Sequence, residues 1–100
     1  MIARHFEFEW DEAKAASNTR KHGVAFDMAS TIFGDAKLLT LADLEHSESE
    51  DRWFSIGCAA NGVLLSVVYL WNDRDGVARV RLISARKATQ TEIRYYQEAL

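Results

Sequence analysis

The chain has 100 residues, 48% of them hydrophobic and 27% charged, and a formal net charge of −3. A chain of this length and composition forms one globular domain around a single core, so we expect one domain over residues 1–100 and exclude a disordered protein. The negative balance argues against a protein that binds duplex DNA regardless of its sequence.

The first half of the sequence predicts a strand followed by two helices. Phe6–Trp10 alternates apolar and acidic residues, as a strand with one solvated face does. Asp11 can cap a helix that runs through His22, where the following glycine supplies a left-handed stop. A second, shorter helix is predicted over Met28–Phe33, with Asp27 as its N-cap.

The second half predicts four strands and a final helix. The strands are expected at Lys37–Ala42, Arg52–Ala59, Val63–Trp71 and Val77–Lys87. The third of these is apolar on both faces and is therefore expected at the centre of the sheet. Thr89 and Glu92 form a capping box that opens a helix toward Leu100. This order predicts an α+β protein, β-α-α-β-β-β-β-α, with an antiparallel sheet and helices on one face.

The strand Val77–Lys87 carries the residues best suited to chemistry. Strand side chains alternate between faces, so Arg79 and Arg81 share one face, and Arg86 and Lys87 follow where the strand ends. Guanidinium groups stay charged and bind phosphate or carboxylate through two N–H groups, so this cluster suits an anion site. The alternative is a set of solvated charges on an exposed or edge strand, where they protect against aggregation.

The first predicted helix carries a second polar set. Lys14, Asn18 and Lys21 fall on one face, with His22 beside them. This stripe either follows a nucleic-acid backbone or is an ordinary solvated helix face. His22, and His46 in the acidic stretch 43–51, are either structural or transfer protons near neutral pH. No metal site is predicted, because the histidines lack metal-ligand spacing and the chain has one cysteine.

Several separated blocks together resemble one known family. They are Phe8-Glu9-Trp10-Asp11, Lys14, Asn18, Lys21-His22-Gly23-Val24, Phe33-Gly34-Asp35, His46-Ser47, Glu50 with Arg52, Ile56-Gly57 and Ile83-Ser84-Ala85-Arg86-Lys87-Ala88. In this order they resemble the BrnT family of ribonuclease toxins of type II toxin–antitoxin pairs. The chain departs from that family at Ala36, where we expect proline, and at Val63, where relatives often carry arginine.

The resemblance implies a fold, an activity and partners. It implies a compact fold similar to RelE-type toxins and a metal-independent cut in RNA that stops translation, with no cofactor. It also implies a BrnA-like antitoxin as protein partner, and operator DNA bound only through the complex with that antitoxin. The longest apolar run is far shorter than the roughly 20 residues that span a bilayer. The N-terminus also lacks a hydrophobic signal core, so we expect a cytoplasmic protein without membrane association.

RNA cleavage without a metal needs stabilisation of a charged phosphorane and groups that transfer protons. We expect catalytic roles for phosphate-binding arginines and two proton-transfer residues: Arg81, Arg86, Arg52, His22 and Tyr95. Contacts to RNA are expected from Lys14, Asn18, Lys21, His46, Arg79 and Lys87. Tyr95 could instead stack on a base or pack in the core. Two alternative functions remain: a non-catalytic protein-binding or corepressor module, and a toxin that acts on a protein target such as a topoisomerase.

Overall fold

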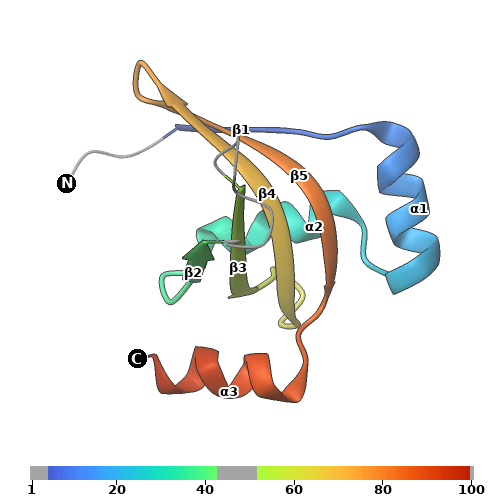
Figure 1. Ribbon diagram of the computed structural model, residues 1–100, viewed down its shortest axis with the longest axis vertical. Helices are drawn as coiled ribbons and strands as arrows, with labels where there is room; N and C mark the ends of the chain where they lie inside the picture. Colours follow the sequence, from blue (N-terminus) through green and yellow to red (C-terminus); the bar gives the residue numbers. More distant parts are fainter. Residues whose placement is uncertain (1–4, 43–51, 100) are drawn as a thin grey trace.

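The computed structural model describes residues 5–42 and 52–99, which form a mixed five-stranded sheet with helices (Figure 1). The elements are β1 (His5–Glu9), α1 (Glu12–His22), α2 (Phe26–Ser30), the 3-10 helix η1 (Thr31–Gly34), β2 (Leu39–Ala42), β3 (Arg52–Cys58), β4 (Leu64–Arg74), β5 (Val77–Lys87) and α3 (Gln90–Glu98). This order confirms the predicted α+β succession. His46 lies outside the described residues. Within them, no helix is long and apolar enough to cross a membrane.

The sheet has the strand order β1-β5-β4-β3-β2. Strands β2 to β5 form the expected antiparallel meander, with β4 at the centre. Strand β1, however, pairs in parallel with β5, so the expectation of a purely antiparallel sheet is wrong. A parallel pair needs a long connection, and the whole chain between these strands supplies it. The arginine-rich strand β5 is consequently an interior strand, not an edge.

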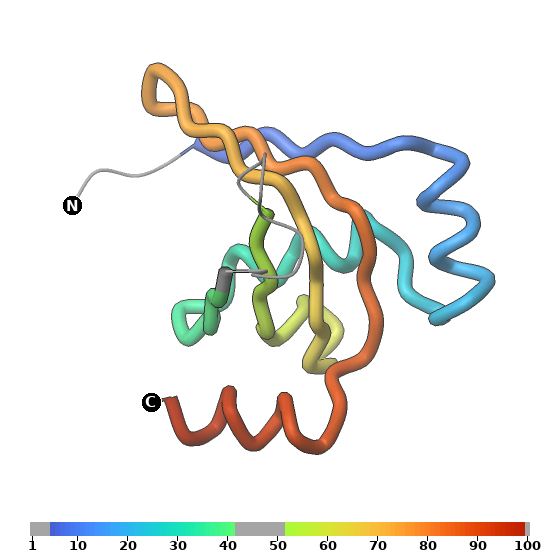
Figure 2. The backbone as a smooth tube through the Cα atoms, in the orientation of Figure 1, coloured from blue at the N-terminus to red at the C-terminus, as the bar shows by residue number. Residues whose placement is uncertain are grey.

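The β4–β5 hairpin is longer than predicted and projects from the body of the protein (Figure 2). Strand β4 continues past the expected end at Trp71 to Arg74, which pairs with Val77. Asp75 and Gly76 make the turn with φ of 55° and 77°. Positive φ at both turn residues is the preference of a tight hairpin, because it matches the twist of the strands.

Helices α1 and α2 pack on one face of the sheet, and α3 lies on the other. Phe26 and Ile32 join Val67 and Leu82 in the core on the first face. Ser66 points to the opposite face, because side chains alternate along β4, and its hydroxyl donates to Glu92 of α3 at 2.8 Å. The prediction of helices on one face therefore holds for α1 and α2 only, and Figure 1 shows α3 apart from them.

Local capping signals set both ends of α1 and the start of α3. Asp11 accepts a hydrogen bond from the backbone N–H of Lys14 at 2.9 Å, and Gly23 ends α1 in the left-handed conformation. The predicted capping box of α3 is present. The predicted cap at Asp27 is wrong, because α2 begins at Phe26 without any side-chain cap.

Candidate functional site

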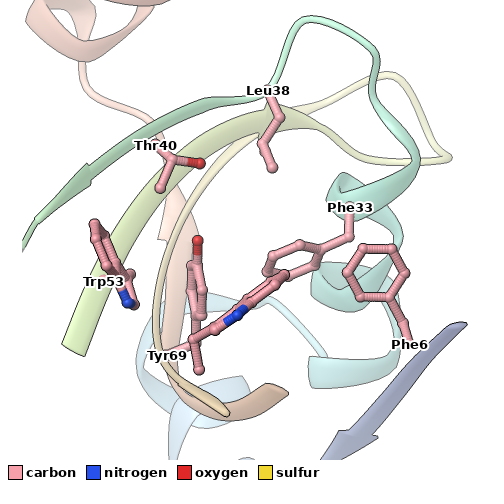
Figure 3. Close-up of a pocket in the computed structure, with 7 residues that line it drawn as sticks. Phe6, Phe33, Leu38, Thr40, Trp53 and Tyr69 are labelled. Atoms are coloured by element: carbon pink, nitrogen blue, oxygen red, sulfur yellow. The ribbon is translucent and has the colours of Figure 1, made fainter. Parts of the chain in front are cut away.

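The two faces of the sheet differ in chemistry. The face that α1 and α2 cover, which we call the helix-covered face, holds an aromatic pocket of about 270 Å³ (Figure 3). Its lining residues are Phe6, Phe33, Leu38, Thr40, Trp53, Tyr69 and Trp71. None of them is charged. The hydroxyls of Thr40, Ser55 and Tyr69 form a hydrogen-bonded chain of 2.9 and 2.6 Å beside the pocket. A phosphate would lose its hydration here without gaining a cation, so this pocket does not suit a nucleic-acid backbone.

The opposite face carries a row of residues across β3, β4, β5 and β1. Arg52 pairs with Leu70, Leu70 with Arg81, and Arg81 with Glu9. Directly paired residues share one face, so both guanidiniums project from the same side of the sheet. Arg79 lies on this side in the next row, and Arg86 lies on this side two rows away in the other direction. We call the surface of Arg52, Arg79, Arg81 and Arg86 the arginine face.

Two arginines of β5 form exposed ion pairs with β1. Arg81 Nη1 lies 2.8 Å from Glu9 Oε2, and Arg79 Nε lies 3.6 Å from Glu7 Oε1. These pairs form because the parallel strand β1 brings two carboxylates into register with the arginines of β5. Their side chains are 42–59% exposed. Such exposed pairs contribute little to the free energy of unfolding.

Arg86 is held more firmly than the other two arginines of β5. Its two terminal nitrogens lie 2.7 and 2.8 Å from the two oxygens of Glu92. Glu92 also accepts from the Ser66 hydroxyl at 2.8 Å and from the Thr89 N–H at 2.9 Å. The hydrogen bonds from Arg86 are the main reason that the pKa of Glu92 falls from 4.5 to about 2. Arg86 therefore anchors α3, which differs from the catalytic role predicted for it.

Asn18 is buried and has a structural role. Its amide nitrogen donates to Val24 O at 2.9 Å and to Ala85 O at 2.8 Å, and its oxygen accepts from Ala85 N at 3.1 Å. The side chain thus pairs with Ala85 much as a neighbouring strand would. The predicted RNA contact of Asn18 is not compatible with this geometry, because the residue is only 6% exposed.

The rest of the predicted stripe on α1 lines a hollow of about 190 Å³ against β5. Lys14, Lys21 and His22 line it together with Ser84. Ser84 pairs with Val68 and so lies on the arginine face. The hollow has basic and hydroxyl groups, and no acidic side chain lines it. Its composition suits an anion next to the arginine face.

Two other predicted residues lie apart from this arrangement. Lys87 pairs with Leu65, a core residue, and therefore lies on the helix-covered side of β5. Tyr95 is 55% exposed on α3. Its neighbour Tyr96 donates a hydrogen bond to Asp35 at 2.6 Å, which raises the pKa of Tyr96 to about 12. This bond ties α3 to the segment before β2, so Tyr96 and not Tyr95 has the defined contact.

The sequence interpretation missed Glu9, which the structure places beside Arg81. The alternation in β1 predicted a solvated acidic face but not its partner. The matching alternation of arginines in β5 was the available signal, since two strands with complementary charges at the same period can pair in register.

Among residues 5–42 and 52–99, no group of three His, Cys, Asp or Glu side chains could hold a metal ion.

Comparisons with known proteins agree with this architecture. The family model for the ribonuclease toxin BrnT of type II toxin–antitoxin systems matches residues 10–92. The fold is similar to the 1.1 Å crystal structure of the Brucella abortus ribonuclease toxin BrnT, with a TM-score of 0.61, 20% identity, and coverage of 86% of this chain and 99% of that chain. No curated protein matches the sequence significantly. At 20% identity, this structural similarity supports the fold alone. The expected similarity of the fold to RelE-type toxins stays a prediction.

Proposed function

Because this chain belongs to the BrnT family of ribonuclease toxins of type II toxin–antitoxin systems, we propose that it is an endoribonuclease that cuts RNA without a metal ion and so inhibits translation. Membership implies RNA as substrate and an antitoxin as partner. We propose that the antitoxin is BrnA-like, that operator DNA binds only through their complex, and that the toxin acts in the cytoplasm. The observation that carries the activity is the row containing Arg52 and Arg81.

The row can supply the charge that RNA cleavage requires. Attack of a 2′-oxygen on the adjacent phosphorus creates a phosphorane with concentrated negative charge, which fixed cationic donors stabilise. Arg52 and Arg81 are separated by one strand, so their backbones are roughly 10 Å apart at the usual strand spacing. Two long arginine side chains can reach a phosphate between them. Arg81 binds Glu9 through one terminal nitrogen, so its other N–H donors can bind that phosphate.

The hollow on α1 extends the proposed path of the RNA. Lys14 and Lys21 are exposed and line the hollow together with Ser84, which lies on the arginine face. We assign them, with Arg79, to neighbouring phosphates, because ammonium groups bind phosphate as point charges without reading sequence. His22 lines the same hollow and is the proposed donor of a proton to the leaving 5′-oxygen.

The test is cleavage of messenger RNA by the purified, antitoxin-free chain in the presence of EDTA. Arg81→Ala should lower the rate by about 10²- to 10³-fold, the usual effect of removing one donor to a developing oxyanion. Arg20→Ala is the matched control, because Arg20 is exposed on α1 and lies outside the hollow. Its rate should equal that of the unmodified chain. Intact RNA after incubation with a folded chain would contradict the proposal.

The ion pairs on β5 favour one alternative, a protein-binding module without catalysis. Under that alternative the arginines serve to hold β1 and to meet an acidic partner. Expression of the chain alone would then leave growth unaffected, and Arg81→Ala would weaken only complex formation. A toxin that acts on a protein would instead stop growth without loss of RNA, so a growth assay combined with RNA analysis separates the three functions.

A further inference from the structure

Glu9 is the acidic end of the row that contains Arg52 and Arg81. It pairs in register with Arg81, and its Oε2 accepts a hydrogen bond from Arg81 Nη1 at 2.8 Å. The side chain is 56% exposed. Its second oxygen, Oε1, has no hydrogen-bond partner among residues 5–42 and 52–99. The carboxylate is therefore oriented through one oxygen and accessible through the other.

The other two carboxylates described on the arginine face are less suited to proton transfer. Glu92 is 15% exposed and both of its oxygens bind Arg86. Glu7 lies 3.6 Å from Arg79, a longer distance than that between Glu9 and Arg81. Its row consists of Glu7, Arg79 and Asn72 and does not include Arg52. Glu9 alone of these three combines an accessible oxygen with a position in the row of two guanidiniums.

We propose that Glu9 is a catalytic residue, the general base of the RNA cleavage proposed above, and this role rests on that function. Oε1 takes the proton of the 2′-hydroxyl while the 2′-oxygen forms a bond to phosphorus. The bond between phosphorus and the 5′-oxygen then breaks, and the leaving oxygen takes a proton from His22. The products are a 2′,3′-cyclic phosphate and a 5′-hydroxyl, and proton exchange with solvent restores Glu9 and His22.

Arg81 links the base to the phosphate. A guanidinium has five N–H donors, so Arg81 can hold Glu9 through one edge and offer its remaining donors to a phosphate oxygen. The 2′-hydroxyl is attached next to that phosphate, and a base held by the same guanidinium is therefore close to the proton that it must take. General bases need this hydrogen-bond reach before any other property matters.

Several charged groups surround Glu9 and bear on any pH profile. Arg81 and Arg79 face it from β5, Glu7 is its neighbour on β1, and Arg52 lies in its row on β3. Asp11 lies beyond the end of β1, and its pKa is lowered chiefly by the hydrogen bond from the Lys14 N–H, with a smaller contribution from Arg81. Glu7 lies next to Arg79 and His5 and outside the row of Arg52 and Arg81, so a Glu7 variant is the control for loss of a carboxylate that pairs with β5.

The experiment compares Glu9→Gln with Glu7→Gln in the full chain, with RNA and EDTA, from acidic to neutral pH. Each substitution removes one carboxylate that pairs with an arginine of β5. We expect Glu9→Gln to lose about 10²- to 10⁴-fold in rate at neutral pH, as loss of a general base does, and to lose the decrease in rate toward acidic pH. Glu7→Gln should keep both the rate and that decrease. Glu9→Asp, which retains a carboxylate, should keep the decrease and part of the rate.

The outcomes separate this inference from the proposed function. If Glu9→Gln cuts RNA as fast as Glu7→Gln with the same pH profile, Glu9 is not the base although the nuclease stands. If the unmodified chain does not cut RNA, the proposed nuclease itself fails. Thermal unfolding of each variant shows whether it is folded, and a merely structural ion pair would change stability in both variants without changing the shape of the pH profile.

Discussion

Asn18 joins α1 to β5 through three hydrogen bonds to the backbone of Val24 and Ala85. Asn18→Ala would leave these buried groups without partners, and each unsatisfied buried group costs about 1–3 kcal/mol. We therefore expect the free energy of unfolding to fall by at least that amount. Denaturant unfolding measures it, and Lys21→Ala on the same helix is the control, since exposed substitutions stay within about 0.5 kcal/mol. Equal stability of the two variants would contradict the structural role.

Individual residues were predicted well where their partners are close in sequence. Asp11 and Thr89 act as caps because their partners lie three residues away. The partner of Asn18 on β5 is 67 residues away, and that of Arg81 is 72 residues away. Helical spacing placed Asn18 beside Lys14 on one face but could not show that β5 covers it. The same long separation hid the pairing of Glu9 with Arg81.

Helix α3 is fastened to the arginine face through Glu92. The pKa of Glu92 in the folded state, about 2, lies below its ordinary value of 4.5, so folding favours the ionised form. This stabilisation is fully present above pH 4.5 and is lost as the pH falls toward about 2. Between pH 4.5 and about 2, the free energy of unfolding of Glu92→Gln should fall less than that of the unmodified chain. At neutral pH it should be less stable by about 1.5–3 kcal/mol, the usual contribution of hydrogen bonds to charged groups.

Unfolding free energies measured from pH 7 to acidic pH test this anchoring. The matched control is Glu98→Gln, because Glu98 is exposed at the end of the same helix. It should follow the pH dependence of the unmodified chain. A Glu92→Gln variant with unchanged stability at neutral pH would show that the bidentate pair does not fasten α3.

Among whole elements, the succession and the central strand were predicted from periodicity, and the pairing of β1 was not. A strand pattern shows which residues share a face, but it does not show whether the first strand joins the sheet in parallel. The register shift between Val68 and Tyr69 was also invisible. It makes Ile83 an extra residue in β5, so Arg81 and Ser84 share a face although their spacing in sequence is odd.

At the scale of the whole molecule, the sheet separates two chemistries. The helix-covered face has the core and the aromatic pocket, and the opposite face has the row of Arg52 and Arg81. Alternation of arginine and apolar residues in Val77–Lys87 predicted this separation. It did not predict that carboxylates of β1 pair with the arginines, because nothing local places β1 there. The site consequently includes an ion pair between Arg81 and Glu9 that the alternation alone does not predict.

RNA binding at the row of Arg52 and Arg81 is tested most directly by an NMR titration with an RNA oligonucleotide. Its riboses are 2′-O-methylated, so that no attacking hydroxyl is present. Side-chain N–H signals of Arg52 and Arg81 and backbone signals of β5 should shift. The indole signals of Trp53 and Trp71, which line the aromatic pocket on the other face, should stay unchanged. Shifts confined to those indoles, with the arginine signals unmoved, would contradict RNA binding on the arginine face.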